Sequence, residues 1–350
     1  MVKGFWEKFQ PKADQPRPEN KPIFALAPMA DVTDAAFRRV IAKYGKPDIT
    51  WTEFVSCDGL CSVGKPKLLK DLWFSDAERP IVAQFFGAKP ENFYRCAKLA
   101  LELGFDGIDI NMGCPDRSIN KQMAGADLMN NPELAKMIIR ETKRGAGKLP
   151  VSVKTRVGYN KENLDEWLKI LLEEQPAAIT IHARTKKELS LVPARWELVA
   201  RAKEIAKDSE TLIIGNGDVT DLRDAYYKCK QTGADGAMLG RAVFGNPWLF
   251  SEYNRAKALT EFETGDAEPF VDQKSILGLS DRLRVMLEHA ELFDELFAGI
   301  KNFALMRKHF GSYVGGFAGA KDLRVKLMEA ENSKQVKQTI EPYLETGPVV

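Results

Sequence analysis

A cysteine with unusual neighbours is the first residue in the chain that suggests chemistry. Cys114 stands between Gly113 and Pro115, directly after the apolar stretch GIDINM. A thiol that only fills a core needs no such setting, because glycine eases a tight turn and proline stiffens the chain that follows. We therefore interpret Cys114 as a thiol presented to a pocket just beyond a buried strand. A buried, inert thiol is the alternative.

A lysine and a histidine occupy comparable positions farther along the chain. Lys154 lies within the apolar run PVSVKT, and His182 lies within AAITIHA. A buried lysine that faces a pocket would stabilise negative charge on a bound ligand. The plainer alternatives are a lysine that reaches solvent from a strand end and a histidine that serves packing alone.

Two glycine-containing segments could bind a phosphate group. GNGDV contains Asn216, Gly217 and Asp218, and GRAVFGNPW begins with Gly240 and Arg241. Glycines let backbone N–H groups approach an anion closely, and an arginine adds a bidentate contact. Two tight turns are the alternative. The chain has neither G-x-G-x-x-G nor G-x-x-x-x-G-K-[S/T], so no Rossmann or P-loop site is predicted.

These residues require elements that bring them together. Short apolar runs alternate with segments of helical period across residues 23–254, which is typical of a (β/α)8 TIM barrel. The predicted strands are 23–27, 48–54, 80–86, 107–111, 150–155, 177–183, 211–216 and 236–240. In such a barrel the carboxyl ends of the strands carry the active site, so Cys114, Lys154 and His182 would face one opening. A doubly wound open sheet is the alternative.

Helical segments are also predicted from the spacing of apolar residues. Two of them lie at 91–104 and 132–145, and the second begins at Pro132 after the cap residue Asn131 and ends at Gly145. The last third of the chain shows helical period and no strand pattern in three segments: 275–296, 299–313 and 320–345. This pattern predicts a smaller helical domain after the barrel.

We divide the chain into an N-terminal arm (1–22), a catalytic barrel (23–254) and a helical domain (255–350). Within the helical domain, residues 301–340 contain eight Lys and Arg residues against three Asp and Glu residues. A local excess of positive charge suits a nucleic-acid backbone. A solvated helix face is the alternative explanation.

Overall composition narrows the class of protein. The net charge is +2 and 44% of the residues are hydrophobic, which is ordinary for a water-soluble globular protein. We find no apolar run of roughly 18 residues and no signal peptide, so we expect a cytoplasmic protein without membrane contact. The five cysteines are scattered and odd in number, which predicts reduced thiols, and their spacing predicts no metal site.

Several ordered motifs resemble one family, the flavin-dependent tRNA-dihydrouridine synthases, and the bacterial type in particular. The motifs are LAPMADVTDAAFRR (26–39), DINMGCP (109–115), VKTRVG (153–158), ITIHART (179–185), IIGNGDV (213–219) and GAMLGRAVFGNPWLF (236–250), and MRKHFGSYVGGFAGAKDLR (306–324) resembles that family's helical domain. The chain departs from the family pattern at KKELSLVPARW (186–196), where a Tyr-x-Gly is more usual.

The resemblance implies that FMN and NADPH are used to reduce the C5–C6 double bond of uridine in tRNA to 5,6-dihydrouridine. It implies that Asn111 and Arg156 hold the uracil and that Cys114 donates a proton. The residues that it implies for flavin binding are Pro28, Met29, Ala30, Gln84, Lys154, His182, Asn216, Gly217, Asp218, Gly240 and Arg241. On the helical domain we add Lys321, Arg324 and Lys326 as candidates for tRNA binding.

The implied chemistry accounts for the setting of Cys114. If hydride from N5 of the flavin reaches C6 of the uracil, the enolate at C4–C5 must take a proton from the other face. A thiol with a reference pKa of about 8.5 is mostly protonated near neutral pH and is still able to release its proton. The loop at Gly113 and Pro115 would hold that thiol over the ring.

Two other functions fit parts of the sequence. A flavin-dependent dihydroorotate or dihydropyrimidine dehydrogenase would share the phosphate segments and the lysine, but it would act on a free pyrimidine and would not need the basic helical domain. An RNA-binding or chaperone-like protein with a barrel as scaffold would not need Cys114, Lys154 and His182 together. The sequence leaves the target uridine, the choice between NADPH and NADH, and the oligomeric state open.

Overall fold

The computed structural model describes residues 3–10, 21–265 and 269–346, and side chains up to residue 344. Eight parallel strands form one sheet in the order β1-β8-β7-β6-β5-β4-β3-β2. The strands are β1 (Ile23–Leu26), β2 (Thr50–Ser56), β3 (Ile81–Phe86), β4 (Gly107–Met112), β5 (Val151–Arg156), β6 (Ala178–His182), β7 (Leu212–Asn216) and β8 (Gly236–Leu239). The ring closes where Leu26 N donates to Ile49 O over 3.2 Å, at the entry to β2. The predicted TIM barrel is confirmed.

The strands form where the sequence is continuously apolar because both of their faces are covered. Every residue of β1, β4, β7 and β8 is buried. The helices around the ring are α1 (Ala35–Tyr44), α2 (Cys57–Leu60), α3 (Lys65–Leu68), α4 (Pro90–Glu102), α5 (Arg117–Asn120), α6 (Pro132–Ala146), α7 (Leu164–Glu173), α8 (Trp196–Ile205), α9 (Leu222–Thr232) and α10 (Glu252–Thr264). Short 3-10 helices are η1 (Gly4–Phe9), η2 (Leu69–Leu72), η3 (Asp76–Glu78), η4 (Gly125–Asn130), η5 (Arg241–Val243) and η6 (Phe303–Met306).

One predicted helix end is wrong. The Asn131 side chain accepts from Leu134 N, as a cap should, but α6 continues past Gly145 to Ala146 and ends at Gly147, whose φ is 58°. Gly145 serves packing instead, because a Cβ there would lie 2.2 Å from Tyr94 O on α4. The glycine that looked like a stop signal allows two helices to touch.

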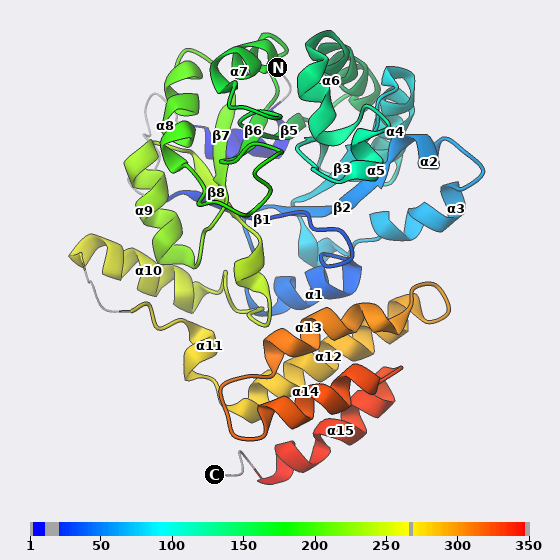
Figure 1. The fold of residues 1–350 in the computed structure, drawn as a ribbon, viewed down its shortest axis with the longest axis vertical. Coiled ribbons are helices and arrows are strands. Elements are labelled where there is room, and N and C mark those ends of the chain that lie inside the picture. The colour runs from blue at the N-terminus through cyan, green and yellow to red at the C-terminus, as the bar shows by residue number, and fades with distance from the viewer. Residues whose placement is uncertain (1–2, 11–20, 266–268, 347–350) are drawn as a thin grey trace.

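The C-terminal helices stack below the barrel in Figure 1, next to α1. They are α11 (Gln273–Ile276), α12 (Leu279–Phe297), α13 (Arg307–Tyr313), α14 (Ala320–Glu329) and α15 (Ser333–Thr346). Their apolar side chains form a core of their own that also takes in Ala35, Ala36 and Val40 of α1. The described residues after β8 contain no strand, in line with the predicted helical character.

The predicted limits of the domains stay predictions. The boundary after residue 254 falls inside α10, whose Phe262 stacks on Tyr226 of α9 with ring centroids 5.7 Å apart. Of the predicted arm, residues 1–2 and 11–20 lie outside the described residues, as do 266–268 and 347–350 of the predicted helical domain. In η1 of the arm, Trp6 is buried against Trp51 of β2 at a centroid distance of 6.2 Å.

A buried ion-pair cluster and a close backbone contact join the helical region to the barrel. Lys301 Nζ lies 2.9 Å from Glu53 Oε2 of β2 and 2.8 Å from Asp71 Oδ1 of η2, with little exposure of any of the three side chains. A second contact is made by Gly245, in the loop that follows η5, where a Cβ would lie 2.0 Å from Ser312 O of α13. The loop after β8 is therefore held directly against the helical region. Within the described ranges, no helix combines the length and apolar character needed to cross a bilayer.

The Gly245 contact leads to a stability prediction. Gly245→Ala should lower the free energy of unfolding by about 2–5 kcal/mol, because alanine is strained at the φ of 61° and its methyl group clashes with α13. Gly265→Ala is the matched control, since Gly265 has a φ of 69° but, among the described residues, no atom within 4 Å of the added Cβ. Thermal unfolding of both variants separates the two effects. Equal losses would show that the contact with α13 contributes nothing.

Candidate active site

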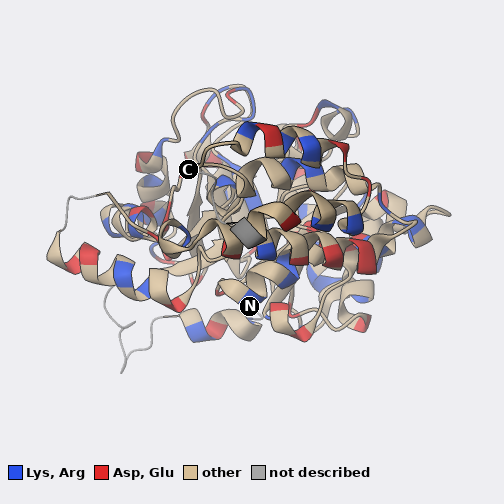
Figure 2. Cartoon of the chain, turned by 90° about the horizontal axis from the view of Figure 1, so that it is seen from below, with Lys and Arg blue, Asp and Glu red and all other residues tan. Residues whose placement is uncertain are grey.

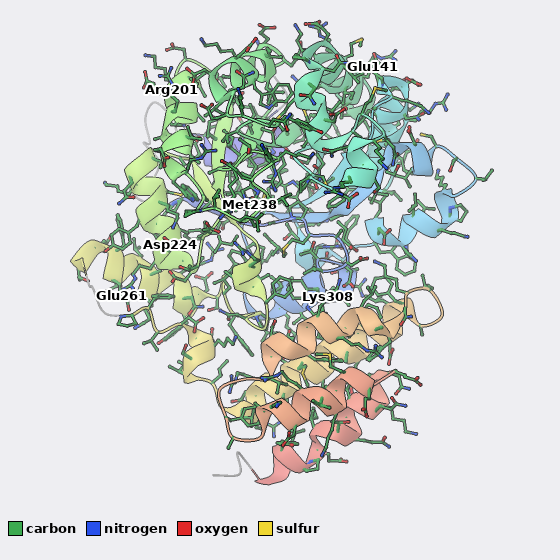
Figure 3. All side chains as sticks on the ribbon, in the orientation of Figure 1. Glu141, Arg201, Asp224, Met238, Glu261 and Lys308 are labelled. Carbon is green, nitrogen blue, oxygen red and sulfur yellow. The ribbon has the colours of Figure 1, made fainter. Side chains whose placement is uncertain are left out.

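A cavity of about 770 Å³ opens at the carboxyl ends of the strands. Met238 of β8, labelled near the middle of the ring in Figure 3, is one of its wall residues. The predicted residues that line it are Pro28, Met29, Gln84, Asn111, Cys114, Lys154, Arg156, His182, Asn216, Gly217, Asp218, Gly240 and Arg241. Ala30 is exposed in the turn after β1 and does not line the cavity. The structure thus brings together predicted residues from seven of the eight strands or the loops that follow them.

The register of β4 to β7 explains this convergence. Asn111 pairs with Lys154, Arg156 pairs with His182, and His182 pairs with Asn216 across neighbouring strands. Because alternate residues of a strand point to the same side, Lys154 and Arg156 both face inward from β5. Lys154 Nζ donates to Asn216 Oδ1 over 3.1 Å. Burial, reinforced by Arg156, lowers the pKa of Lys154 to about 8.

His182 is held neutral by its surroundings. Burial and then the nearby Arg156 and Lys154 lower the pKa of its imidazole far below the ordinary value. Its Nε2 lies 3.1 Å from Nη1 of Arg184, and a guanidinium donates hydrogen bonds only. Nε2 is therefore the acceptor, and the ring proton lies on Nδ1.

Arg184 is the functional candidate that the sequence-based assignment missed. It is almost fully buried, lines the cavity, and donates from Nε to Val192 O over 2.6 Å. It also forms an ion pair with Asp218. The signal was its position, because Arg184 directly follows the predicted strand 177–183, and polar residues after barrel strands lie at the end that carries the site. Phe54 of β2 also lines the cavity and was not predicted.

The loop after β7 gathers the arginines around Asp218. Gly217 and Asp218 have φ values of 117° and 49°, and a Cβ on Gly217 would lie 3.0 Å from His182 Cδ2. Arg241 Nη2 donates to Asp218 Oδ1 over 2.7 Å, and hydrogen bonding with Arg184 lowers the pKa of Asp218. The Asp218 carboxylate is thereby occupied by guanidinium groups, whereas the Arg241 side chain stays largely exposed.

A buried polar network forms the floor of the cavity. Gln84 Nε2 donates to Asp109 Oδ2 over 2.7 Å, and Ser152 Oγ donates to Asp109 Oδ1 over 2.5 Å. Gln84 Oε1 in turn accepts from Asn111 Nδ2 over 3.1 Å. Burial raises the pKa of Asp109 to about 6. Gln84 and Asn111 are therefore fixed in orientation, since each side chain is used by a neighbour.

The Cys114 thiol lies in a loop shaped by Asn111. Asn111 Oδ1 accepts from the backbone N–H groups of Gly113 and Cys114, over 3.1 and 2.9 Å. Burial raises the pKa of the thiol above its ordinary value, so it is protonated at neutral pH. The sequence suggested that Gly113 permits a tight turn, but its φ is not positive. A Cβ at this position would lie 3.2 Å from the backbone of Thr155. Close packing of β4 on β5 explains the glycine.

Arg156 ties two loops of the cavity together. Its Nε donates to Gly113 O over 2.8 Å, and its Nη1 donates to Thr185 O and Leu189 O, both over 3.1 Å. Burial lowers the pKa of its guanidinium to about 10. The loop that carries Cys114 and the loop after β6 are therefore positioned by one side chain.

The basic residues of the C-terminal region are spread out. Lys321 and Lys326 are exposed on α14, but Arg324 is half-buried and donates to Val314 O over 3.0 Å. Lys301 forms buried ion pairs with Glu53 and Asp71 and is therefore not part of an exposed basic surface. Figure 2, which views the molecule from the side of these helices, shows basic and acidic residues interspersed. None of these residues lines the cavity.

Cys57, Cys61, Cys96 and Cys114 are free thiols. Cys96 Sγ lies 3.8 Å from Cys57 O, and Cys61 Sγ lies 3.9 Å from Asn92 O. Among the described residues, no group of three or more His, Cys, Asp or Glu side chains is arranged to hold a metal ion.

The fold and the cavity define a TIM-barrel protein with a cation-rich site at the carboxyl ends of its strands. The family model for dihydrouridine synthase (Dus) matches residues 25–346, and the chain therefore belongs to the dihydrouridine synthase family. A probable tRNA-dihydrouridine synthase of Staphylococcus epidermidis is 37% identical over 327 residues, which are 92% of this chain and 94% of the relative. Probable tRNA-dihydrouridine synthase 2 of Bacillus subtilis is 35% identical over 348 residues, 98% of this chain and 97% of the relative.

Solved structures show the same barrel at low sequence identity. Histamine dehydrogenase from Rhizobium sp. 4-9 aligns with a TM-score of 0.50 at 14% identity, over 77% of this chain and 48% of that chain. The 6-hydroxypseudooxynicotine amine oxidase from Pseudomonas geniculata N1 aligns with a TM-score of 0.51 at 12% identity, over 77% of this chain and 50% of that one. This chain thus spans about half the length of both proteins, and the likeness concerns the fold.

The lowered pKa of Lys154 leads to a prediction for the ligand-free protein. Between about pH 8 and the ordinary value of 10.5 the unfolded chain binds more protons than the folded one, so stability rises with pH in this window. Below it, the charged lysine costs stability in full. Lys154→Met should therefore raise the melting temperature at pH 7, and the gain should shrink between pH 8 and 10.5. Lys169→Met, an exposed lysine of α7, is the control. A gain that is independent of pH would show that the ammonium group is not the cause.

Proposed function

We propose that this protein reduces the C5–C6 double bond of uridine in tRNA to 5,6-dihydrouridine, with FMN as cofactor and NADPH as electron donor. The observation that carries the proposal is a protonated thiol, Cys114, in the same cavity as Lys154 and Arg156. Relatives that align over nearly their whole length bear the name of this activity. Because the substrate would be tRNA, we place the enzyme in the cytoplasm.

The size and the charge of the cavity support the binding of a flavin mononucleotide. Its volume of about 770 Å³ lies within the range of roughly 300–1,000 Å³ that ligand pockets span. Within the described residues, the Lys154 ammonium makes one protein hydrogen bond out of the three that it can donate. The cations that line the walls, Lys154, Arg156, Arg184 and Arg241, outnumber the carboxylate of Asp218. An anionic ligand would balance them.

Every predicted flavin-binding residue except Ala30 then has a task. Lys154 would face the part of the ring that becomes negative, and His182 would donate a hydrogen bond from Nδ1. Gly217, Gly240 and Arg241 would bind the phosphate group, while Asp218 would orient the arginines rather than touch the ligand. Pro28 and Met29 from the β1 turn, together with Gln84 and Asn216, would surround the ring, whereas Ala30, which does not line the cavity, would not contact it. When bound, the cofactor supplies the hydride that NADPH has delivered.

The remaining residues would handle the uracil base. Asn111 and Arg156 would hold it, and both are already fixed by hydrogen bonds to neighbouring groups. Cys114 Sγ would give its proton to C5 as the hydride reaches C6. The reaction then consumes one hydride and one proton for each double bond, and the thiolate regains its proton from solvent.

A flavin-dependent dihydroorotate or dihydropyrimidine dehydrogenase acting on a free pyrimidine is the second candidate function, because the same cavity chemistry would serve a free base. Family membership favours tRNA. The test is dihydrouridine mapping by mass spectrometry in tRNA incubated with the purified protein, FMN and NADPH. Turnover of orotate or uracil without any change in the tRNA would exclude the proposal. A protein that binds RNA but is not bleached by NADPH would point to a non-enzymatic role.

Cys114→Ala should separate the two half-reactions. The flavin should still be bleached by NADPH at close to the wild-type rate, because that step needs no thiol. Reoxidation of the prereduced enzyme by tRNA should slow by roughly 10²–10⁴-fold, the usual contribution of one general acid. Single-turnover absorbance of the flavin measures both steps in one preparation. Wild-type reoxidation in the variant would remove Cys114 from the reaction and return it to the class of inert thiols.

We also propose that Lys321, Arg324 and Lys326 of α14 contribute to tRNA binding. Arg324 also has a structural bond to Val314 O, so the test leaves it in place. Lys321→Gln with Lys326→Gln should weaken tRNA binding and reduce the slope of log K against log salt by roughly 1.4–1.8, about 0.7–0.9 for each lost contact. Lys148→Gln with Lys169→Gln, two exposed barrel lysines, is the control. An unchanged slope in the α14 variant would place the RNA elsewhere.

A further inference from the structure

The loop between β6 and α8 exposes apolar side chains beside the cavity. Leu191 is 83% exposed, and Leu189 and Val192 are also exposed, although Ser190 between them lines the cavity. Folding gains nothing from leucine side chains left in water, so a cluster of them on one loop indicates a contact with another molecule. The segment is also the one in which the chain departs from the family pattern.

This loop is held in one shape by the site itself. Its carbonyl groups at Leu189 and Val192 accept hydrogen bonds from the buried Arg156 and Arg184. At its start, Lys186 N donates to Gly158 O over 2.8 Å and Lys187 N donates to Tyr159 O over 3.0 Å. The apolar side chains are therefore presented on a fixed backbone, which reduces the entropy lost when a ligand is bound.

A second apolar tip is tied to the catalytic loop. Met123 is 58% exposed, and the segment around it folds back onto Cys114, whose carbonyl accepts from Asn120 Nδ2 over 2.8 Å and from Ala126 N over 3.0 Å. Arg156 links the two tips, because it bonds both Gly113 O and Leu189 O. Both tips are thus connected by hydrogen bonds to the loop that presents the thiol.

Basic residues accompany both tips. Lys186 and Lys187 precede Leu189, and Arg117 and Lys121 precede Met123; all but the half-buried Lys186 are exposed. Apolar side chains next to cations suit unstacked nucleotides, since bases pack on apolar side chains and phosphates pair with the cations. A protein partner would not need to be placed at the entrance of a cavity that accepts a base.

Resting on the proposed function, we propose that Leu189, Leu191 and Met123 pack against the nucleotides that flank the target uridine in tRNA. The two tips would hold the neighbouring bases apart while the uracil enters the cavity. They would contribute to the choice of uridine, because only an unstacked loop of RNA could reach them. Flavin reduction by NADPH does not involve this surface.

The experiment compares Leu191→Ser with two matched variants. Leu191→Phe keeps an apolar surface for stacking, and Leu103→Ser removes a 41%-exposed leucine after α4, at the other end of the barrel. We expect Leu191→Ser to raise the Kd for tRNA and to lower kcat/KM for tRNA by about tenfold, with normal bleaching of the flavin by NADPH. Leu191→Phe should retain wild-type values, as should Leu103→Ser.

The outcomes separate this inference from the proposed function. If the wild type forms dihydrouridine and Leu191→Ser matches Leu103→Ser in both Kd and kcat/KM, the RNA contact at the loop is excluded while the activity stands. If the wild type forms no dihydrouridine but Leu191→Ser still binds tRNA more weakly, the surface is an RNA contact and the proposed reaction is wrong. Loss of flavin bleaching in Leu191→Ser would assign the loop to the cavity wall instead.

Discussion

An excess of buried positive charge at the carboxyl ends of β5 and β6 is the feature on which the rest of the site depends. Lys154, Arg156 and Arg184 lie around a histidine that burial, together with these cations, keeps neutral. Placing cations together away from water is costly, and only a rigid barrel with fixed strand register can hold them there. The lowered pKa of Lys154 reflects this cost in free energy, and a bound anion would reduce the cost.

The same charges also build the walls of the cavity. Guanidinium groups have several donors, and in this site Arg156 and Arg184 use some of them on backbone carbonyls of loops. Arg156 and Arg184 consequently fix the loops after β4 and β6, and Asp218 fixes Arg184 and Arg241. The same arginine side chains would therefore provide positive charge for a ligand and hydrogen bonds that hold the loops. A substitution of either arginine would therefore change both binding and loop geometry.

Most of the barrel could be predicted from the sequence because buried parallel strands are continuously apolar and end in polar residues. The eight predicted strands match the observed ones to within two residues at either end. Long-range contacts were not predictable. Lys301 looked like part of a basic surface, but it is buried against Glu53 and Asp71, which lie more than 200 positions earlier in the chain. Gly145 looked like a helix stop, but a glycine is required there because Tyr94 O on α4 leaves no room for a Cβ.

The protonated state of Cys114 follows from a competition within the cavity. Cations lower the pKa of a nearby thiol, and many reactive cysteines are thiolates for that reason. Here burial is the larger effect and raises the pKa, with Arg156 and Lys154 opposing it more weakly. The resting Cys114 side chain is therefore a neutral thiol, which can act as an acid, rather than a nucleophilic thiolate. If Cys114 donates its proton as proposed, the same two cations would stabilise the resulting thiolate and so assist the transfer.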